Sequence, residues 1–436
     1  MRKINKIFAA VLLVITVIAL SSCSIFDLAS RTSTDTTGKQ EKYLTEKDVG
    51  RILEGIEENV TVNAGDNINI TVNSSDNVNV LAASKGLLST VSITANFTVT
   101  TVIPPSFFYE GYTETTEQTS RGSGVIYKID KEKGDAYIIT NYHVVYYKGA
   151  DTENDVSDDI QCYLYGQEYD KYAINASFIG GSMAYDIAVL KVSKSDVLRQ
   201  SRAVAAEFAD SNNVSILDTA IAIGNPEGLG ISATVGAVNV ESESIVMRSL
   251  NGSGNVEIRV LRIDTAVNSG NSGGGLYDDK GRVIGIVNAK ITDSTVDNIG
   301  YAIPSNVAKY AADNIIYYDG IDEKNDSVYR VLIGIGVEVK SAGVTYDEES
   351  GKVLKYEEVA VKSIDENGVC YGKLEVGDIV KAVIVDGVEH RVRRTFNVVD
   401  IMLTARQTSA VVFVVERNGT QIQIEIDMSK TTPTPA

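Results

Sequence analysis

Short apolar runs separated by turn residues fill the chain from about residue 82 to residue 318. They include GSGVIYKI, AYIITNY, IQCYLYG, DIAVLKV, TAIAIG, RVIGIV and IGYAI. Closely spaced short strands of this kind are typical of an all-β barrel or sandwich. The apolar residues of 306–317 (NVAKYAADNIIY) have helical spacing instead, so we expect one helix to close this domain.

The regions that flank this domain have different patterns. A ten-residue repeat, TVNAGDNINI followed by TVNSSDNVNV, spans residues 61–80 and keeps its apolar residues at one parity, which predicts a small hairpin or an added edge strand. A second β-rich region with one helix, from about Thr395 to Ala405, follows a polar linker. We expect the last residues, 429–436, to form a disordered tail.

The N-terminus has the pattern of a targeting segment. Ile7 to Leu20 is apolar and follows a basic start, and as a helix it would rise only about 21 Å, less than the roughly 30 Å hydrocarbon core of a bilayer. This length favours a signal peptide over a membrane span. The next residues, Leu20-Ser21-Ser22-Cys23, resemble the bacterial lipobox. The resemblance implies cleavage before Cys23 and lipidation of its sulfur; a plain cleaved signal or an uncleaved anchor is the alternative.

Composition limits the kinds of binding site and cross-link that the chain can form. The 436 residues carry 40 basic and 58 acidic side chains, a net charge of −18, which argues against non-specific nucleic-acid binding. The three cysteines are too few for a disulfide framework, and we expect Cys162 and Cys370 to be buried free thiols. Two histidines, His143 and His390, cannot form a multi-histidine metal site, and we predict neither a metal nor a cofactor.

Three short segments each place one polar side chain at the edge of an apolar strand. They are TNYHVV (140–145), YDIAVL (185–190) and GNSGG (270–274). A serine hydroxyl is a weak nucleophile that needs a base within hydrogen-bond reach. His143 can take the proton of Ser272 and return it to a leaving amine, while Asp186 would hold the imidazole tautomer. The N–H groups of Gly270 and Ser272 are our candidate donors to the developing oxyanion.

As a set, the apolar and catalytic segments resemble the HtrA/Deg family of trypsin-like serine proteases with a C-terminal PDZ domain. The matching stretches are GSGVIY (122–127), TNYHVV (140–145), YDIAVLKV (185–192), IGNPEGLGISATVGAV (223–238), IDTAVNSGNSGGGL (263–276), GRVIGIVNAK (281–290) and GYAIPSN (300–306). The resemblance implies a mainly β fold, a chymotrypsin-like double β-barrel followed by a PDZ domain, with catalysis in the cleft between the barrels. The segment from about Pro104 to Ser120 reads as a modest loop, which makes a large multi-subunit cage doubtful and leaves a homotrimer open.

The same resemblance suggests a substrate pocket and a peptide groove. Ala266, Val267, Ala289 and Ile291 would line an uncharged primary pocket that favours aliphatic side chains, because burying an unpaired charge is costly. A PDZ groove would bind the C-terminal carboxylate of an extended peptide through backbone N–H groups. Its candidate residues are Ile333, Gly334, Ile335, Phe396, Val399 and Leu403. The last three have helical spacing and could equally be core.

The residues before Ser272 indicate how the activity of the site would be controlled. Asn271, not an aspartate, stands before Ser272, so a trypsin-type zymogen switch cannot operate. The loop from Val267 to Asn271 has few apolar anchors, and we expect it to populate an inactive state.

These interpretations divide the chain into six parts. They are a lipoprotein signal peptide (1–22), a tether with the strand repeat (23–81), a protease domain (82–318), a linker (319–327), a PDZ domain (328–428) and the tail (429–436). The leading hypothesis is a membrane-tethered, extracytoplasmic serine endopeptidase that cleaves unfolded or damaged proteins. The alternatives are a non-proteolytic peptide-binding sensor or chaperone, and an esterase; the esterase is disfavoured because GNSGG lies between strands and not in a strand-to-helix elbow.

Overall fold

The computed structural model describes residues 32–34, 40–42, 60–64, 68–72, 78–105, 110–289, 299–321, 327–347 and 351–435. The chain divides into two compact units, residues 1–78 and 79–436, each described by itself below. The predicted signal peptide and Cys23 lie outside the described residues. Within the described ranges, no helix has the length and apolar character needed to cross a membrane.

The first unit contains two antiparallel strand pairs. β1 (Thr32–Thr34) pairs with β2 (Gln40–Lys42), and β3 (Val60–Ala64) pairs with β4 (Ile68–Val72). The second pair confirms the hairpin expected from the start of the repeat. The end of the repeat differs from the expected strand, because Val78 begins the helix α3 (Val78–Ser89).

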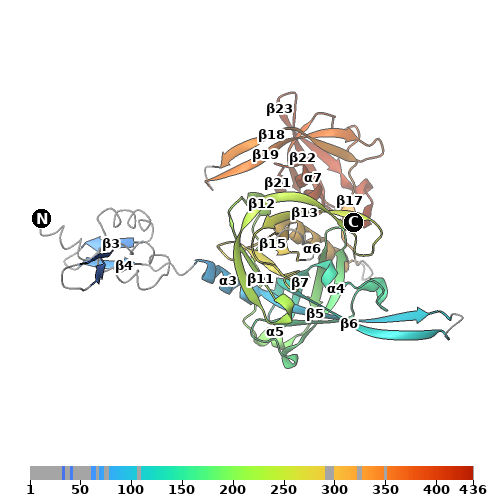
Figure 1. The fold of residues 1–436 in the computed structure, drawn as a ribbon. Coiled ribbons are helices and arrows are strands. Elements are labelled where there is room, and N and C mark those ends of the chain that lie inside the picture. The colour runs from blue at the N-terminus through green and yellow to red at the C-terminus, as the bar shows by residue number, and fades with distance from the viewer. Residues whose placement is uncertain are drawn as a thin grey trace. The chain divides into compact units, whose positions relative to one another are not determined.

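The second unit begins with two closed six-stranded barrels (Figure 1). The first barrel has the strand order β10-β7-β6-β5-β8-β9. Its strands are β5 (Thr90–Ile103), β6 (Tyr112–Asp130), β7 (Asp135–Thr140), β8 (Asp159–Leu164), β9 (Ile174–Ser182) and β10 (Ile187–Val192). The second has the order β11-β12-β13-β16-β15-β14. Its strands are β11 (Thr219–Gly224), β12 (Ser232–Arg248), β13 (Asn255–Ile263), β14 (Gly275–Tyr277), β15 (Val283–Val287) and β16 (Gly300–Pro304). The predicted double barrel is confirmed.

An apolar cluster common to both barrels positions the catalytic segments. It contains Val125, Ile139 and Val189 from the first barrel and Ile223 and Ile286 from the second, all fully buried. The residues at the ends of these strands therefore meet in one place. The helix α6 (Ser305–Asp319) also packs into this cluster, as the sequence predicts.

Short helices complete the unit. They are α4 (Tyr142–Val145), α5 (Asp196–Gln200), α7 (Thr395–Met402) and the 3-10 turns η2 (Glu153–Asp155), η3 (Asp170–Tyr172), η4 (Ser211–Asn213), η5 (Pro226–Gly228) and η6 (Met428–Lys430).

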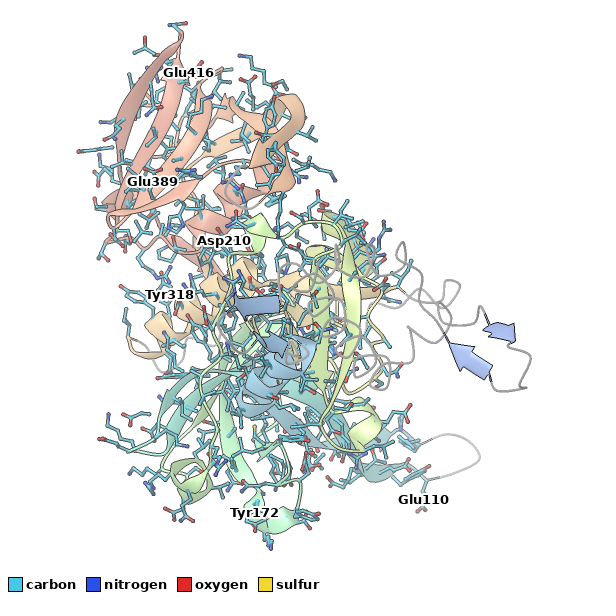
Figure 2. The ribbon with its side chains drawn as sticks, turned by 90° about the vertical axis from the view of Figure 1, so that its left-hand side faces the viewer. Glu110, Tyr172, Asp210, Tyr318, Glu389 and Glu416 are labelled. Atoms are coloured by element: carbon cyan, nitrogen blue, oxygen red, sulfur yellow. The ribbon has the colours of Figure 1, made fainter. Side chains whose placement is uncertain are left out.

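The segment expected to be a loop between Pro104 and Ser120 is in part a strand, because β6 begins at Tyr112. β5 and β6 stay paired beyond the barrel as far as the Ile103–Tyr112 pair and form a two-stranded arm (Figure 1). The expected loop was too long because the threonine-rich sequence from Tyr112 to Ser120 favours an extended strand. Glu110 marks the far end of the arm in Figure 2.

The C-terminal region folds as a sheet with the order β18-β19-β20-β22-β23, with β21 paired to β20 and α7 packed against it. The strands of this sheet are β18 (Ile335–Asp347), β19 (Lys352–Ile364), β20 (Ile379–Val385), β21 (Val388–Arg391), β22 (Ala410–Arg417) and β23 (Thr420–Asp427). A separate two-stranded sheet is formed by β17 (Tyr329–Val331) and β24 (Pro433–Pro435). The prediction of a disordered tail was wrong, because β24 pairs with β17. Met428, which is 2% exposed, anchors the chain just before this strand.

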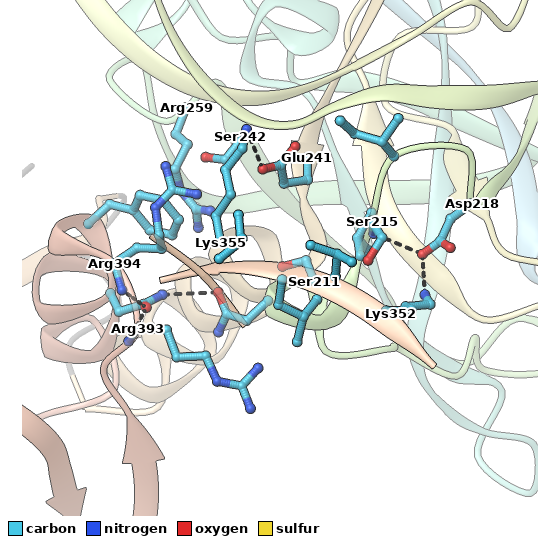
Figure 3. A pocket seen from close by; sticks show the side chains of 18 of the residues that line it. Ser211, Ser215, Asp218, Glu241, Ser242, Arg259, Lys352, Lys355, Arg393 and Arg394 are labelled. Atoms are coloured by element: carbon cyan, nitrogen blue, oxygen red, sulfur yellow. Dashed lines mark hydrogen bonds and ion pairs between the residues drawn. The ribbon is translucent and has the colours of Figure 1, made fainter. Parts of the chain in front are cut away.

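This sheet packs on the second barrel around a cavity of about 420 Å³ (Figure 3). Lys352 pairs with Asp218 at 2.5 Å and Lys355 with Glu241 at 2.7 Å. Each ion pair joins a lysine of β19 to the second barrel. The charged side chains of these two pairs, which line the cavity, therefore already have partners.

Candidate active site

His143 and Asp186 form a buried pair at the ends of neighbouring strands. His143 lies on α4 just after β7, and Asp186 immediately precedes β10 with a left-handed φ of 49°. The Nδ1 atom of His143 lies 2.7 Å from Oδ2 of Asp186, and the backbone N–H of His143 donates to Oδ1 at 3.0 Å. Asp186 is 2% exposed. A carboxylate in its charged form only accepts hydrogen bonds, so this contact fits the tautomer with the proton on Nδ1 and leaves Nε2 able to accept a proton.

A third group holds the carboxylate, and the sequence reasoning missed it. Asn288 is fully buried just after β15, and its Nδ2 donates to Asp186 Oδ2 at 2.7 Å. Asn141 Nδ2 donates to the backbone carbonyl of Asp186 at 2.9 Å. The sequence did contain a signal for Asn288, since it is a polar residue directly after the apolar strand RVIGIV. His143 and Asp186 also lie at the ends of apolar strands.

Ser272 enters the site from the loop before β14. It is 5% exposed, and its carbonyl accepts from the N–H of Ser123 at 2.8 Å. The side-chain Oγ accepts from the N–H of Ala289 at 3.1 Å. Since Ala289 follows Asn288, two consecutive residues contact the nucleophile and the aspartate, and the predicted triad is brought together. Among the described residues, the hydroxyl of Ser272 rests on this N–H and forms no hydrogen bond with His143.

The geometry of Gly270 suits an oxyanion donor. The carbonyl of Ser269 accepts from the N–H of Glu227 at 2.8 Å. In a trans peptide the next N–H points the opposite way, so Gly270 N–H faces away from that turn. Gly270 has φ 96°, and a Cβ there would lie 2.2 Å from the carbonyl oxygen of Asn225. Only glycine fits this position.

The loop expected to be weakly anchored is held by polar contacts. The hydroxyl of Thr234 donates to the carbonyl of Ala266 at 2.8 Å, and Asn271 N–H donates to the carbonyl of Asn268 at 3.0 Å. The apolar pattern could not reveal these bonds, because their partners are distant in sequence or belong to the backbone. The structure thus contains the loop in one hydrogen-bonded conformation, and the inactive state expected from sequence stays a prediction.

Three of the four predicted pocket residues can be placed. Ala266 is exposed and Val267 is half-buried against the core of the second barrel. Ala289 is buried beside Ser272, and Ile291 lies outside the described residues. A Cβ on Gly300 would lie 2.8 Å from Val267, so a side chain there would crowd this wall.

The predicted groove residues separate into different environments. Gly334 has φ 76° and precedes Ile335, the first residue of the edge strand β18. Val399 is 48% exposed, whereas Phe396 lies under the guanidinium of Arg259 from β13, 4.0 Å from the ring centre. The remaining two, Ile333 and Leu403, are buried. Leu403 packs into the cluster shared with the barrels and α6, so its core alternative is correct and a groove-lining role is not.

The remaining chemistry-bearing residues are structural. Burial raises the pKa of both Cys162 and Cys370 to about 12, and both are free thiols, as predicted. No cluster of three or more potential metal ligands occurs within the described ranges.

The sequence and the fold are similar to those of known proteins. Residues 122–286 match the model of the trypsin-like peptidase domain. The chain is 37% identical over 215 residues to the serine protease Do-like HtrA of Bacillus subtilis (strain 168), covering 48% of this chain and 43% of that protein. It is 33% identical over 285 residues to the serine protease Do-like HtrB of the same strain, covering 59% and 57%.

The chain is also 33% identical over 267 residues to the probable periplasmic serine endoprotease DegP-like of Brucella suis. This match covers 61% of this chain and 44% of that protein. The chain thus spans about half the length of the curated relatives it matches. Among solved structures, the HtrA-type protease AlgW with tripeptide is 24% identical, with a TM-score of 0.47, covering 82% of this chain and 97% of that chain.

Proposed function

We propose that this protein is a serine endopeptidase of the HtrA/Deg type. The observation that carries the proposal is the meeting of His143, Asp186 and Ser272 at the ends of strands from two barrels, with the His143–Asp186 contact at 2.7 Å. The trypsin-like domain match and the serine-protease relatives support it.

The proposed mechanism assigns one task to each group. Ser272 Oγ attacks the scissile carbonyl while Nε2 of His143 takes its proton and later gives it to the leaving amine. Asp186 holds the imidazole tautomer and stabilises the imidazolium. The N–H groups of Gly270 and Ser272 stabilise the oxyanion, which is among the largest contributions in such enzymes.

The resting position of Ser272 is easily left. Its contact with Ala289 is a single neutral hydrogen bond, whose net contribution is about 1 kcal/mol. The proposed mechanism requires rotation about the Cα–Cβ bond to exchange this contact for one with His143, and side chains move between such staggered positions. We infer that substrate binding favours this rotation.

The direct experiment is cleavage of casein by wild type and by Ser272→Ala. We expect cleavage by the wild type and a loss of several orders of magnitude in the variant. Combining Ser272→Ala with alanine at His143 and Asp186 should cost little more, because the three act as a unit. Additive losses, or an active Ser272→Ala protein, would exclude this mechanism.

Location and substrate are part of the same proposal. We infer that the mature chain starts at a lipidated Cys23, is anchored to the cell membrane outside the cytoplasm, and cleaves unfolded or damaged polypeptides. One relative is named periplasmic, which supports an extracytoplasmic site. The C-terminal sheet would act as a PDZ domain, with peptide C-termini adding to the edge strand β18.

A non-proteolytic peptide sensor is the second candidate. The contact of Ser272 Oγ with Ala289, in place of His143, is what an idle cleft would show. The casein assay separates the two functions, because a sensor cleaves casein neither with nor without the Ser272 hydroxyl.

A further inference from the structure

Ser123 is a fully buried serine of β6 that contacts the nucleophile loop through both its backbone and its side chain. Its N–H donates to the carbonyl of Ser272 at 2.8 Å, and its carbonyl accepts from the hydroxyl of Thr140 at 2.7 Å. Its own hydroxyl donates to the carbonyl of Gly270 at 2.7 Å and accepts from the N–H of Asn225 at 2.8 Å. The single hydroxyl proton is therefore committed to Gly270.

These contacts fix the peptide groups on both sides of Gly270. The preceding carbonyl, that of Ser269, accepts from Glu227 N–H, and the following one, that of Gly270 itself, accepts from Ser123 Oγ. A residue has two soft backbone dihedrals, so holding both flanking peptides sets the direction of its N–H. Glycine needs such support, because its backbone has the widest freedom.

The two supports are coupled through one short turn. Asn225, whose N–H donates to the Ser123 hydroxyl, begins the turn that carries Glu227. Glu227 itself has a left-handed φ of 55°, and Asn225 Oδ1 accepts from Gly230 N–H at 2.7 Å across the same turn. Loss of the Ser123 hydroxyl would free the carbonyl of Gly270 and loosen the turn that orients the peptide before it.

We propose that Ser123 is a positioning residue for the oxyanion hole. Its hydroxyl sets the Gly270 N–H toward the developing oxyanion without contacting the substrate. This inference rests on the proposed endopeptidase function and names a residue on which that function depends.

The test is the Ser123→Ala variant of the full chain, assayed on a short fluorogenic peptide. Removal of an oxyanion donor lowers kcat by about 10²–10³. Because the Gly270 N–H stays on the chain and is only misdirected, we expect a loss in kcat of roughly 10- to 100-fold, with KM changed by less than about threefold. A peptide aldehyde, whose tetrahedral adduct places its oxygen in the hole, should lose affinity by a factor that follows kcat.

Ser305→Ala is the matched control. Ser305 is 1% exposed, and its hydroxyl donates to the carbonyl of Ala209 at 2.7 Å, so a hydroxyl-to-carbonyl bond of the same length is lost away from the catalytic groups. Both variants should lose stability in urea unfolding, Ser123→Ala the more because its hydroxyl also accepts from Asn225 N–H, while only Ser123→Ala loses kcat and aldehyde affinity. Ser123→Cys, which keeps a weaker donor of similar shape, should have an intermediate kcat.

The outcomes are distinct. Wild-type kcat in Ser123→Ala, or an equal loss in Ser305→Ala, overturns the role of Ser123. If Ser123→Ala does not fold, Ser123→Cys decides, and wild-type kcat and aldehyde affinity in that variant overturn the role. A wild type without Ser272-dependent cleavage overturns the proposed function itself, and this role with it.

Discussion

Replacement of Asn288 by alanine would test how the triad carboxylate is held. The carboxylate of Asp186 accepts three hydrogen bonds: two from His143, at 2.7 and 3.0 Å, and one from Asn288 Nδ2 at 2.7 Å. Asn288→Ala removes the third and leaves Oδ2 of a buried carboxylate with His143 alone. The carboxylate is then free to turn away from the geometry that orients the imidazole.

The magnitude follows from the charge on the acceptor. A hydrogen bond to a charged group contributes about 1.5–3 kcal/mol, and each 1.36 kcal/mol is a factor of ten in rate. If the whole contribution is lost in the transition state, kcat/KM falls by roughly 10- to 150-fold. We expect most of the loss in kcat, because the imidazolium that needs an oriented carboxylate forms only in the transition state.

The assay compares Asn288→Ala with Asn306→Ala. Asn306 Nδ2 donates to Asp210 Oδ1, also at 2.7 Å, between α6 and the N-terminus of the turn η4, and neither residue contacts the triad. Both variants lose an amide–carboxylate bond, so both should lose thermal stability. Only Asn288→Ala should lose activity per folded molecule. Wild-type kcat/KM in Asn288→Ala, or a similar deficit in Asn306→Ala, would refute the reasoning.

Three further predictions concern the pocket, the anchor and pH. Val267→Asp should reduce cleavage after aliphatic residues by placing a charge in an uncharged wall; a cleavage map dominated by Lys or Arg would contradict that pocket. Cys23→Ala should move the protein from membranes to the soluble fraction, or leave it unprocessed, and an intact mass without acyl groups on wild type would exclude lipidation. Burial and then the charge of Lys309 lower the pKa of His390 below its ordinary 6.5. Its neutral form is favoured in the fold, so this contribution to the free energy of unfolding is complete above pH 6.5 and is lost as pH falls through the lowered pKa. His390→Phe should flatten that dependence in urea titrations, and an unchanged slope would contradict it.

The barrels and the triad could be predicted because their signals are local. An apolar strand records its burial in its own residues, and His143, Asp186 and Ser272 each stand beside such a strand. Once strands of both barrels share one buried cluster, the residues at their ends must meet. The arm between β5 and β6 was missed because its strands have no apolar face to mark them. Their pairing shows only when both strands are placed side by side.

The supports of the site escaped prediction for a different physical reason. Ser123, in GSGVIY, and Asn288, in GIVNAK, act through partners far along the chain: Ser123 Oγ reaches Gly270, and Asn288 reaches Asp186. A buried serine or asparagine shows in sequence only that it needs a partner, since an unpaired buried polar group is costly. Which partner it finds depends on the closure of both barrels.

The same dependence on distant partners explains why the order of the oxyanion loop was not predicted. With few apolar anchors in Val267 to Asn271, local pattern favours a mobile loop, yet bonds from β6 and the 225–228 turn fix it. Control of the proposed endopeptidase should therefore act on those distant bonds, because the loop has few apolar contacts of its own to order it.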